Sequence, residues 1–271
     1  MLFLYFNLYY MKIPIYQVDA FTKTLFGGNP AAICPLEDWL TDEQMQKIAM
    51  ENNLAETAYL VKNGADYDIR WFTPAVEVKL CGHATLAAAH ILFNHGATEA
   101  NELVFHSKSG PLKVTRNGDT LTLDFPALPF ELVSHVPRGI FEGLGITAAP
   151  VYKSSFDYMV ILPSQKTIEG LRPDFKELAQ VDARGVIATA PGDEVDFVSR
   201  CFFPQSGIDE DPVTGSAHTV MVPYWSQQLG KIKMKAIQLS KRRGWLDCEL
   251  AGDRVLMSGK AVTYLTGEIN I

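Results

Sequence analysis

The sequence predicts an α+β protein made of two similar halves, and three observations lead to this fold class. Short segments rich in β-branched and aromatic residues outnumber the helical segments. The turns between them favour hairpins, as at Asn117-Gly118. One pattern of strand, loop and helix residues occurs twice in the chain. These features favour mostly antiparallel sheets over a doubly wound parallel sheet.

The first half contains most of the clear signals. Thr41 is the predicted N-cap of a helix, and Gln44 follows at the capping-box position. The residues at 84–93 are small and apolar, so we expect that helix to be buried on all sides. The predicted elements are strands at 13–18, 31–34, 56–61, 67–72, 103–105, 112–115 and 121–125, with helices after Thr41 and at 84–93.

A boundary between the halves is predicted where Pro126, Pro129 and Pro137 occur close together. The second half repeats the style of the first. Its predicted elements are strands at 158–162, 185–190 and 195–203, a helix at 217–229, and further strands to the end of the chain.

The internal repeat is the strongest clue to function. It pairs Arg70-Trp71-Phe72-Thr73-Pro74 and Cys81-Gly82-His83-Ala84-Thr85 with Arg200-Cys201-Phe202-Phe203-Pro204 and Thr214-Gly215-Ser216-Ala217-His218. In each copy the loop ends in glycine and small residues where a helix begins. The free N–H groups and the dipole of a helix start favour an anion. Two such starts facing each other predict a carboxylate site, although a glycine there could also serve only close helix packing.

Composition excludes several classes of protein. The formal net charge is −7 and the pI is about 5.4, which argues against a nucleic-acid partner. The four cysteines lie far apart with no CxxC pair, so we expect reduced thiols, no metal site and a cytoplasmic protein. No apolar run approaches the roughly 20 residues of a membrane helix. No dinucleotide or phosphate-loop motif is present.

The first ten residues, MLFLYFNLYY, are apolar but lack the features of a signal peptide. Met11 directly precedes the first predicted strand. We expect residues 1–10 to be an extension upstream of a natural start at Met11, and an edge strand or packing arm is the alternative.

Four motifs in order resemble the phenazine-biosynthesis PhzF-like family. They are Val18-Asp19-Ala20-Phe21-Thr22 with Gly28-Asn29-Pro30-Ala31, Asn53-Leu54-Ala55-Glu56-Thr57, Cys81-Gly82-His83-Ala84-Thr85-Leu86, and Glu210-Asp211-Pro212-Val213-Thr214-Gly215-Ser216-Ala217. The resemblance implies a diaminopimelate epimerase-like fold, in which two pseudo-symmetric domains each wrap a sheet around a central helix. It also implies a homodimer, no cofactor, and an active site between the domains. The expected domains are 11–127 plus about 260–271, and 128–259.

The resemblance also implies a role for each matching residue. Glu56 would be the catalytic acid/base of a proton-shifting isomerase. His83, Asp211 and Ser216 would bind and orient a small carboxylate-bearing substrate. The carboxylate itself would lie against the backbone around the two helix starts, at Gly82, Ala84, Thr214 and Gly215.

Each of these residues also has a simpler interpretation. Glu56 could be a surface residue at a strand start, and Asp211 a turn residue before Pro212. For His83, the nearby helix start is expected to lower the pKa and keep the imidazole neutral. The basic residues between Lys231 and Arg243 are expected to be solvated.

Two other functions stay open. Racemases of the wider fold use two cysteines, at the positions that the repeat gives to Cys81 and Thr214. A Thr hydroxyl is too weak an acid to replace a thiol, so Cys81 is expected to be a small buried residue with at most an accessory role. A cysteine-assisted epimerase is therefore one alternative. A catalytically silent small-molecule-binding protein is the other.

Overall fold

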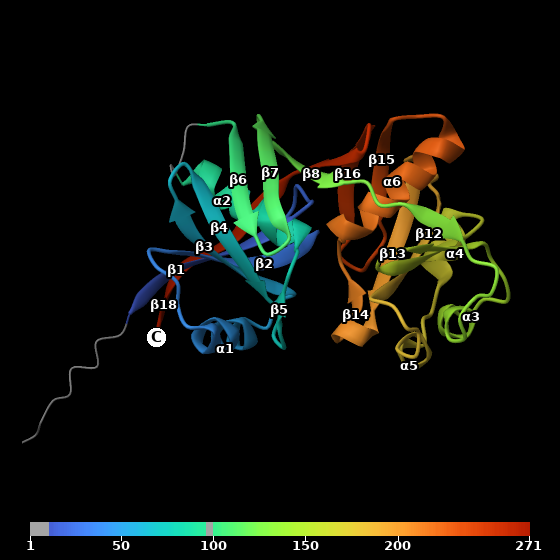
Figure 1. Cartoon of the computed structure of the whole chain (residues 1–271), viewed down its shortest axis with the longest axis horizontal. Helices are drawn as coiled ribbons and strands as arrows, with labels where there is room; N and C mark the ends of the chain where they lie inside the picture. The colour runs from blue at the N-terminus through green and yellow to red at the C-terminus, as the bar shows by residue number, and fades with distance from the viewer. Residues whose placement is uncertain (1–10, 96–99) are drawn as a thin grey trace, which may run out of the picture.

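The computed structural model describes residues 11–95 and 100–271, which form two halves lying side by side (Figure 1). The extension predicted at residues 1–10 lies outside the described residues. Strands dominate and few helices are present, as the α+β prediction requires.

The first half runs from the first strand to a strand that leads into the second half. Its elements are β1 (Lys12–Ala20), β2 (Asn29–Leu36), α1 (Asp42–Asn52), β3 (Glu56–Asn63), β4 (Asp66–Phe72), β5 (Glu77–Val78), α2 (Gly82–Asn94), β6 (Glu102–Ser107), β7 (Gly110–Asn117) and β8 (Thr120–Pro126).

The second half follows, and one final strand ends the chain. The elements are β9 (Phe130–Leu132), α3 (Ile140–Leu144), β10 (Val151–Ser154), β11 (Asp157–Ile161), α4 (Gln165–Gly170), α5 (Phe175–Leu178), β12 (Gly185–Pro191), β13 (Phe197–Phe203), the 3-10 turn η1 (Pro204–Ser206), β14 (Ile208–Asp211), α6 (Gly215–Leu229), β15 (Lys233–Gln238), β16 (Gly244–Ala251), β17 (Arg254–Gly259) and β18 (Ala261–Asn270).

The strands of the two halves pair in the same order and with the same polarity. In the first half β1–β2, β3–β4, β6–β7 and β7–β8 are antiparallel, while β2–β3 and β4–β6 are parallel. In the second half β10–β11, β12–β13, β15–β16 and β16–β17 are antiparallel, while β11–β12 and β13–β15 are parallel. The two halves are therefore pseudo-symmetric, as the repeat predicts.

Two strand pairings tie the halves together. β8 pairs with β17 along the junction. Just after β8, β9 pairs with β10 within the second half. At the other end of the chain, β18 leaves the second half and pairs with β1 of the first (Figure 1). This return of the C-terminal strand supports the proposed division into 11–127 plus about 260–271, and 128–259.

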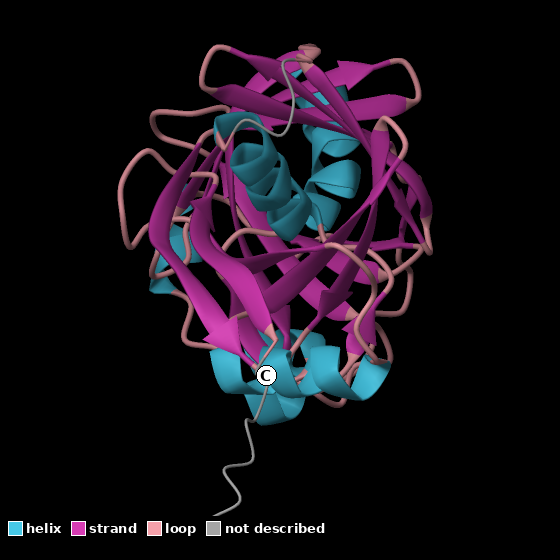
Figure 2. Ribbon diagram, turned by 90° about the vertical axis from the view of Figure 1, so that its left-hand side faces the viewer, coloured by secondary structure: helices cyan, strands magenta, loops and turns pink. Residues whose placement is uncertain are grey.

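A long helix lies at the centre of each half, with strands around it (Figure 2). All residues of α2 are buried except His90 and Asn94, so the prediction of an almost fully buried helix is correct. Alanines occupy much of α2, which lets the sheet pack closely around it. In α6 the buried residues include Val220, Met221 and Trp225.

An arginine–glutamate pair braces the loop before each central helix. Arg70 on β4 contacts both carboxylate oxygens of Glu77 on β5 at 2.8 Å each. Arg200 on β13 contacts Glu210 on β14 in the same bidentate way, at 2.7 and 2.8 Å. Glu210 is therefore part of a partly buried ion pair. These two ion pairs fix the loops that lead into α2 and α6.

The predicted capping box is confirmed: Thr41 and Gln44 cap α1 reciprocally. The short helices α3, α4 and α5 were not predicted from the sequence. They have only four to six residues, which is too short for a helical repeat of apolar residues to be recognised. No helix among the described residues is long and apolar enough to cross a membrane.

The solvated position predicted for the basic run is wrong for Arg242. Its guanidinium crosses between the halves to Asp19, which is 2% exposed, with Nη2 2.7 Å from Oδ1. It also donates to the carbonyls of Gly27 and Gly28, at 2.9 Å each. A carboxylate buried in the first half requires this cation from the second.

Candidate functional site

The two central helices begin at the same place, on opposite sides of the junction between the halves. A Cβ atom added to Gly82 would lie 3.5 Å from the Cα of Gly215. Around this contact stand Glu56 at the start of β3, His83 in the first turn of α2, and Asp211 at the end of β14. All three are buried, with exposed fractions of 9%, 4% and 8%. The simple interpretation of Glu56 as a surface residue is therefore wrong.

Glu56 and His83 face each other directly. Oε2 of Glu56 lies 3.1 Å from Nε2 of His83. The two atoms are within ion-pair distance but not aligned as a hydrogen bond, and neither has a hydrogen-bond partner among the described residues. Buried polar atoms without partners are rare in native proteins. Unsatisfied buried groups of this kind are found at functional sites.

The other imidazole nitrogen of His83 lies near two further groups. Nδ1 is 3.6 Å from the sulfur of Cys81 and 3.1 Å from Nδ2 of Asn29. Burial alone would lower the pKa of His83, but its interactions with Cys81 and Glu56 outweigh burial and raise that pKa well above its usual value. The prediction of a neutral imidazole is therefore wrong, because Cys81 and Glu56 both raise the pKa of His83.

Asp211 is held by one residue from each half. Oδ1 accepts from Nδ2 of Asn29 at 2.7 Å, and Oδ2 accepts from the Thr214 hydroxyl. Burial is the main cause that raises the pKa of Asp211 to about 6, and nearby Glu56 raises it further. Asp211 is therefore a structured, titratable group and not a simple turn residue.

Asn29 was not among the site residues predicted from the sequence. It is fully buried at the start of β2, and its amide nitrogen also donates to the carbonyl of Val213 at 3.0 Å. Asn29 thus links the first half to the loop of the second half that carries Asp211. The signal was present in the Gly28-Asn29-Pro30 motif, but a sequence cannot show that its side chain crosses the junction.

The starts of the two central helices have no side-chain cap. Cys81 and Thr214 are the N-cap residues of α2 and α6, and neither side chain caps its helix. The Thr214 hydroxyl is instead used by Asp211. Ser216, half-buried in the first turn of α6, accepts from Nη1 of Arg184 at 3.0 Å. The structure therefore brings the predicted binding residues Gly82, Ala84, Thr214, Gly215 and Ser216 to one place, and their roles stay predictions.

Three of the buried side chains could be considered as metal ligands. Glu56, Cys81 and His83 each offer one ligand atom, and these atoms lie within 4.8 Å of one another. Burial, with a contribution from Glu56, raises the pKa of Cys81 to about 11. Binding of a metal by this group would therefore have to release the proton of the Cys81 thiol. The three ligand atoms alone do not identify a metal centre, because buried acidic, thiol and imidazole groups also cluster in sites that hold no metal.

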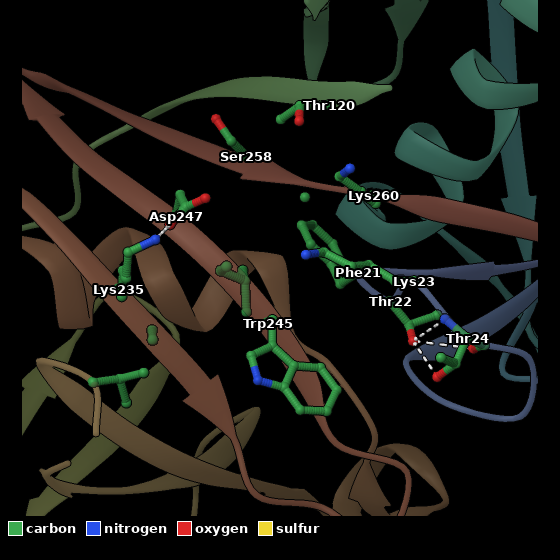
Figure 3. A pocket seen from close by; sticks show the side chains of 14 residues that line it. Phe21, Thr22, Lys23, Thr24, Thr120, Lys235, Trp245, Asp247, Ser258 and Lys260 are labelled. Carbon is green, nitrogen blue, oxygen red and sulfur yellow. Dashed lines mark hydrogen bonds and ion pairs between the residues drawn. The ribbon is translucent and has the colours of Figure 1, made fainter. Parts of the chain in front are cut away.

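A cavity of about 410 Å³ lies elsewhere at the junction and is lined by both halves (Figure 3). Thr22 and Lys23 belong to the first half, and Lys235 and Trp245 to the second. Lys235 is paired with Asp247 at 2.8 Å. Glu56, His83 and Asp211 do not line this cavity, so it is separate from the candidate site.

Comparison with known proteins gives a consistent result. The family model of the PhzC-PhzF family, described as phenazine biosynthesis-like protein, matches residues 18–267. An uncharacterized isomerase of Pseudomonas aeruginosa is 50% identical over 96% of this chain and 100% of its own length. A PhzF family structure from Enterococcus faecalis is 45% identical with a TM-score of 0.92, covering 96% of this chain and 100% of that one.

A more distant likeness concerns the fold alone. A hydroxyproline epimerase from Agrobacterium vitis has a TM-score of 0.64 at 11% identity, over 96% of this chain and 93% of that one. The epimerase-like fold class is therefore shown.

Proposed function

Because the chain belongs to the PhzC-PhzF family of phenazine biosynthesis-like proteins, we propose that it is a cofactor-independent isomerase with Glu56 as acid/base. Its substrate would be a small molecule bearing a carboxylate, of the dihydro-hydroxyanthranilate or amino-acid type. The reaction would move one proton from one carbon of the substrate to another.

One observation carries this proposal. Oε2 of Glu56 and Nε2 of His83 are buried, unpartnered and 3.1 Å apart, beside two uncapped helix starts. A carboxylate in such a position can accept a proton from a substrate carbon and return it to another. His83, whose pKa is raised, supplies a positive neighbour that orients the carboxylate.

The surrounding groups suit the charge that such a reaction develops. Removal of a proton from carbon leaves negative charge on the substrate, and the free N–H groups of the two helix starts are placed to stabilise it. Glu56 exchanges the proton that it removes with solvent and returns a proton to another carbon of the same molecule, so no oxidant or reductant is consumed. Asp211, with a pKa of about 6, can donate a hydrogen bond to the substrate while it is protonated.

The cysteine-assisted alternative is weaker on geometric and chemical grounds. Cys81 and Thr214 occupy equivalent N-cap positions, so the second half has no thiol there. The raised pKa of Cys81 also keeps its thiol protonated at neutral pH.

The proposal is tested by proton NMR of the protein with 2,3-dihydro-3-hydroxyanthranilate in D₂O. The wild type should form isomerised product that carries deuterium. Glu56→Gln should lower the rate by about a thousandfold or more, since it keeps the shape but loses the base. Cys81→Ser is the matched control inside the same site and should keep most of the rate.

Three results would contradict parts of this assignment. A fully active Glu56→Gln would exclude Glu56 as the base. A collapse of the rate in Cys81→Ser alone would favour the thiol mechanism. Ligand binding without turnover by the wild type would favour a silent binding protein.

A further inference from the structure

The pseudo-symmetry shows which residue of the second half corresponds to Glu56. In the first half Thr57 of β3 lies opposite Phe72 of β4, and in the second half Val186 of β12 lies opposite Phe202 of β13. Phe72 and Phe202 are partners in the sequence repeat. The residue before Thr57 is Glu56, and the residue before Val186 is Gly185.

Gly185 has no room for a side chain. A Cβ atom there would lie 2.1 Å from Cδ1 of Phe203 and 2.5 Å from the carbonyl oxygen of Phe202. The second half therefore cannot place a carboxylate where the first half places Glu56. Arg184, the residue before Gly185, instead approaches the start of α6.

Arg184 and Ser216 form the counterpart of the Glu56–His83 pair. Gly82 and Gly215 are repeat partners, so His83 and Ser216 hold the same position in the first turn of their helices. Nη1 of Arg184 lies 3.0 Å from Oγ of Ser216, and Oε2 of Glu56 lies 3.1 Å from Nε2 of His83. In both halves the pair lies where a strand start meets the first turn of the central helix. In the first half it is an acid/base pair, and in the second half it is a guanidinium and a hydroxyl.

Arg184 is held rigidly but keeps part of its donor capacity. Nε and Nη2 donate to the two carboxylate oxygens of Asp157, which is 1% exposed. The guanidinium also lies 5.4 Å from the ring centres of Phe156 and Phe203. A guanidinium has five N–H groups, and three are used by Asp157 and Ser216. The other two have no hydrogen-bond partner in the described part of the chain, and the side chain is 33% exposed.

We propose that Arg184 is a specificity-determining residue that, with Ser216, binds the anionic group of the substrate. The two free N–H groups of Arg184, the Ser216 hydroxyl and the uncapped start of α6 offer donors to an anion. The reacting carbon then lies toward Glu56 and His83 on the other side. This inference rests on the proposed function, because it assigns the second half of the same site.

The test uses isothermal titration calorimetry of the full-length protein with two matched probes, 2-aminobenzoate and its neutral amide, 2-aminobenzamide. The wild type should bind the carboxylate at least tenfold more tightly than the amide. Arg184→Gln should weaken carboxylate binding about tenfold or more and leave amide binding unchanged, because it removes the charged donors. Arg184→Lys should retain part of the preference, since Lys keeps the charge without the planar fork. The exposed Arg172→Gln in the same half is the control and should behave as the wild type.

A second readout does not depend on the stability of a variant. In the wild type, the ¹⁵Nη resonances of Arg184 should shift on addition of 2-aminobenzoate and not on addition of the amide. Equal binding of the two probes by the wild type, absence of binding, or a carboxylate preference that survives in Arg184→Gln would overturn the proposal. Glu56→Gln should still bind 2-aminobenzoate, so failure of the acid/base assignment and failure of the Arg184 assignment give different results.

Discussion

At the scale of single residues, Asp211 differs from a surface aspartate in its burial and in its raised pKa. Its carboxylate is buried between Asn29 and Thr214, and it lies near Glu56. Burial raises the pKa of Asp211 from 3.8 to about 6, so at neutral pH the protein keeps a charge where charge is unfavourable. A site residue that destabilises the fold is a common feature of active sites.

This pKa leads to a prediction about stability and pH. The pKa of Asp211 is higher in the folded than in the unfolded state, so the folded state binds the Asp211 proton more tightly. The stabilisation from this proton is complete below pH 3.8 and is lost as the pH rises through about 6. Asp211→Asn removes the ionisation, and we expect it to raise the free energy of unfolding at pH 8 by up to roughly 3 kcal/mol. The gain should shrink toward pH 5. Urea unfolding at both pH values measures this, with the exposed Asp209→Asn as control. Equal destabilisation by Asp211→Asn at both pH values would show that its hydrogen bonds, not its charge, dominate.

At the scale of elements, the strand–loop–helix unit explains why the site residues meet. Each unit places a strand start beside the first turn of a central helix, and a bidentate Arg–Glu pair fixes the loop between them. The two units then meet at Gly82 and Gly215. β2 adds Asn29 at its first residue, and the loop before β2 depends on a tight backbone turn at Gly28.

Gly28 is predicted to be essential for this loop. It has φ of 58°, and a Cβ atom there would lie 2.0 Å from the carbonyl oxygen of Ala20. Gly28→Ala should therefore lower the free energy of unfolding by about 3 kcal/mol or more. Gly64→Ala is the matched control, because Gly64 has φ of 62° with open space around it. That variant should lose only about 1 kcal/mol. Chemical denaturation of both variants gives the comparison, and equal losses would mean that backbone strain alone, without the clash, sets the cost.

At the scale of the whole molecule, the junction between the halves holds the site together. β8 pairs with β17, β18 returns to β1, and Asn29 reaches the loop that carries Asp211. Arg242 adds a charged link to the buried Asp19. The homodimer expected from the family resemblance stays a prediction.

Arg242 and its neighbour Arg243 allow a matched test of this junction. Arg242→Gln leaves the buried Asp19 carboxylate without its cation, so we expect a loss of about 3–5 kcal/mol in the free energy of unfolding. The Arg243 side chain is exposed, and its one ion-pair contact among the described residues is a long one of 3.9 Å to Glu169. Arg243→Gln should therefore cost less than about 0.5 kcal/mol. Urea titration followed by tryptophan fluorescence measures both. Similar small losses in the two variants would show that the junction does not depend on this charge pair.

Local patterns were sufficient for several predictions. Thr41 and Gln44 predict the capping box of α1, and the alanine-rich segment predicts a buried helix, because both depend on short-range preferences. The repeat of Arg70 and Phe72 as Arg200 and Phe202 predicts the two pseudo-symmetric halves. The motif around Glu56 identifies a candidate acid/base, although not what it contacts. Each of these features is a short local pattern, even where the pattern occurs twice, so the sequence alone is sufficient to predict it.

Only the tertiary structure decided which groups meet across the junction. It placed Asn29 beside Asp211, Arg242 beside Asp19, and Arg184 beside Ser216. It also placed Cys81 and Glu56 beside His83, and these two groups raise the pKa of His83. Most of these contacts join residues far apart in the chain, and their strength depends on burial and on distances of about 3 Å. Local preferences do not encode those distances, because they arise only when the two halves pack together.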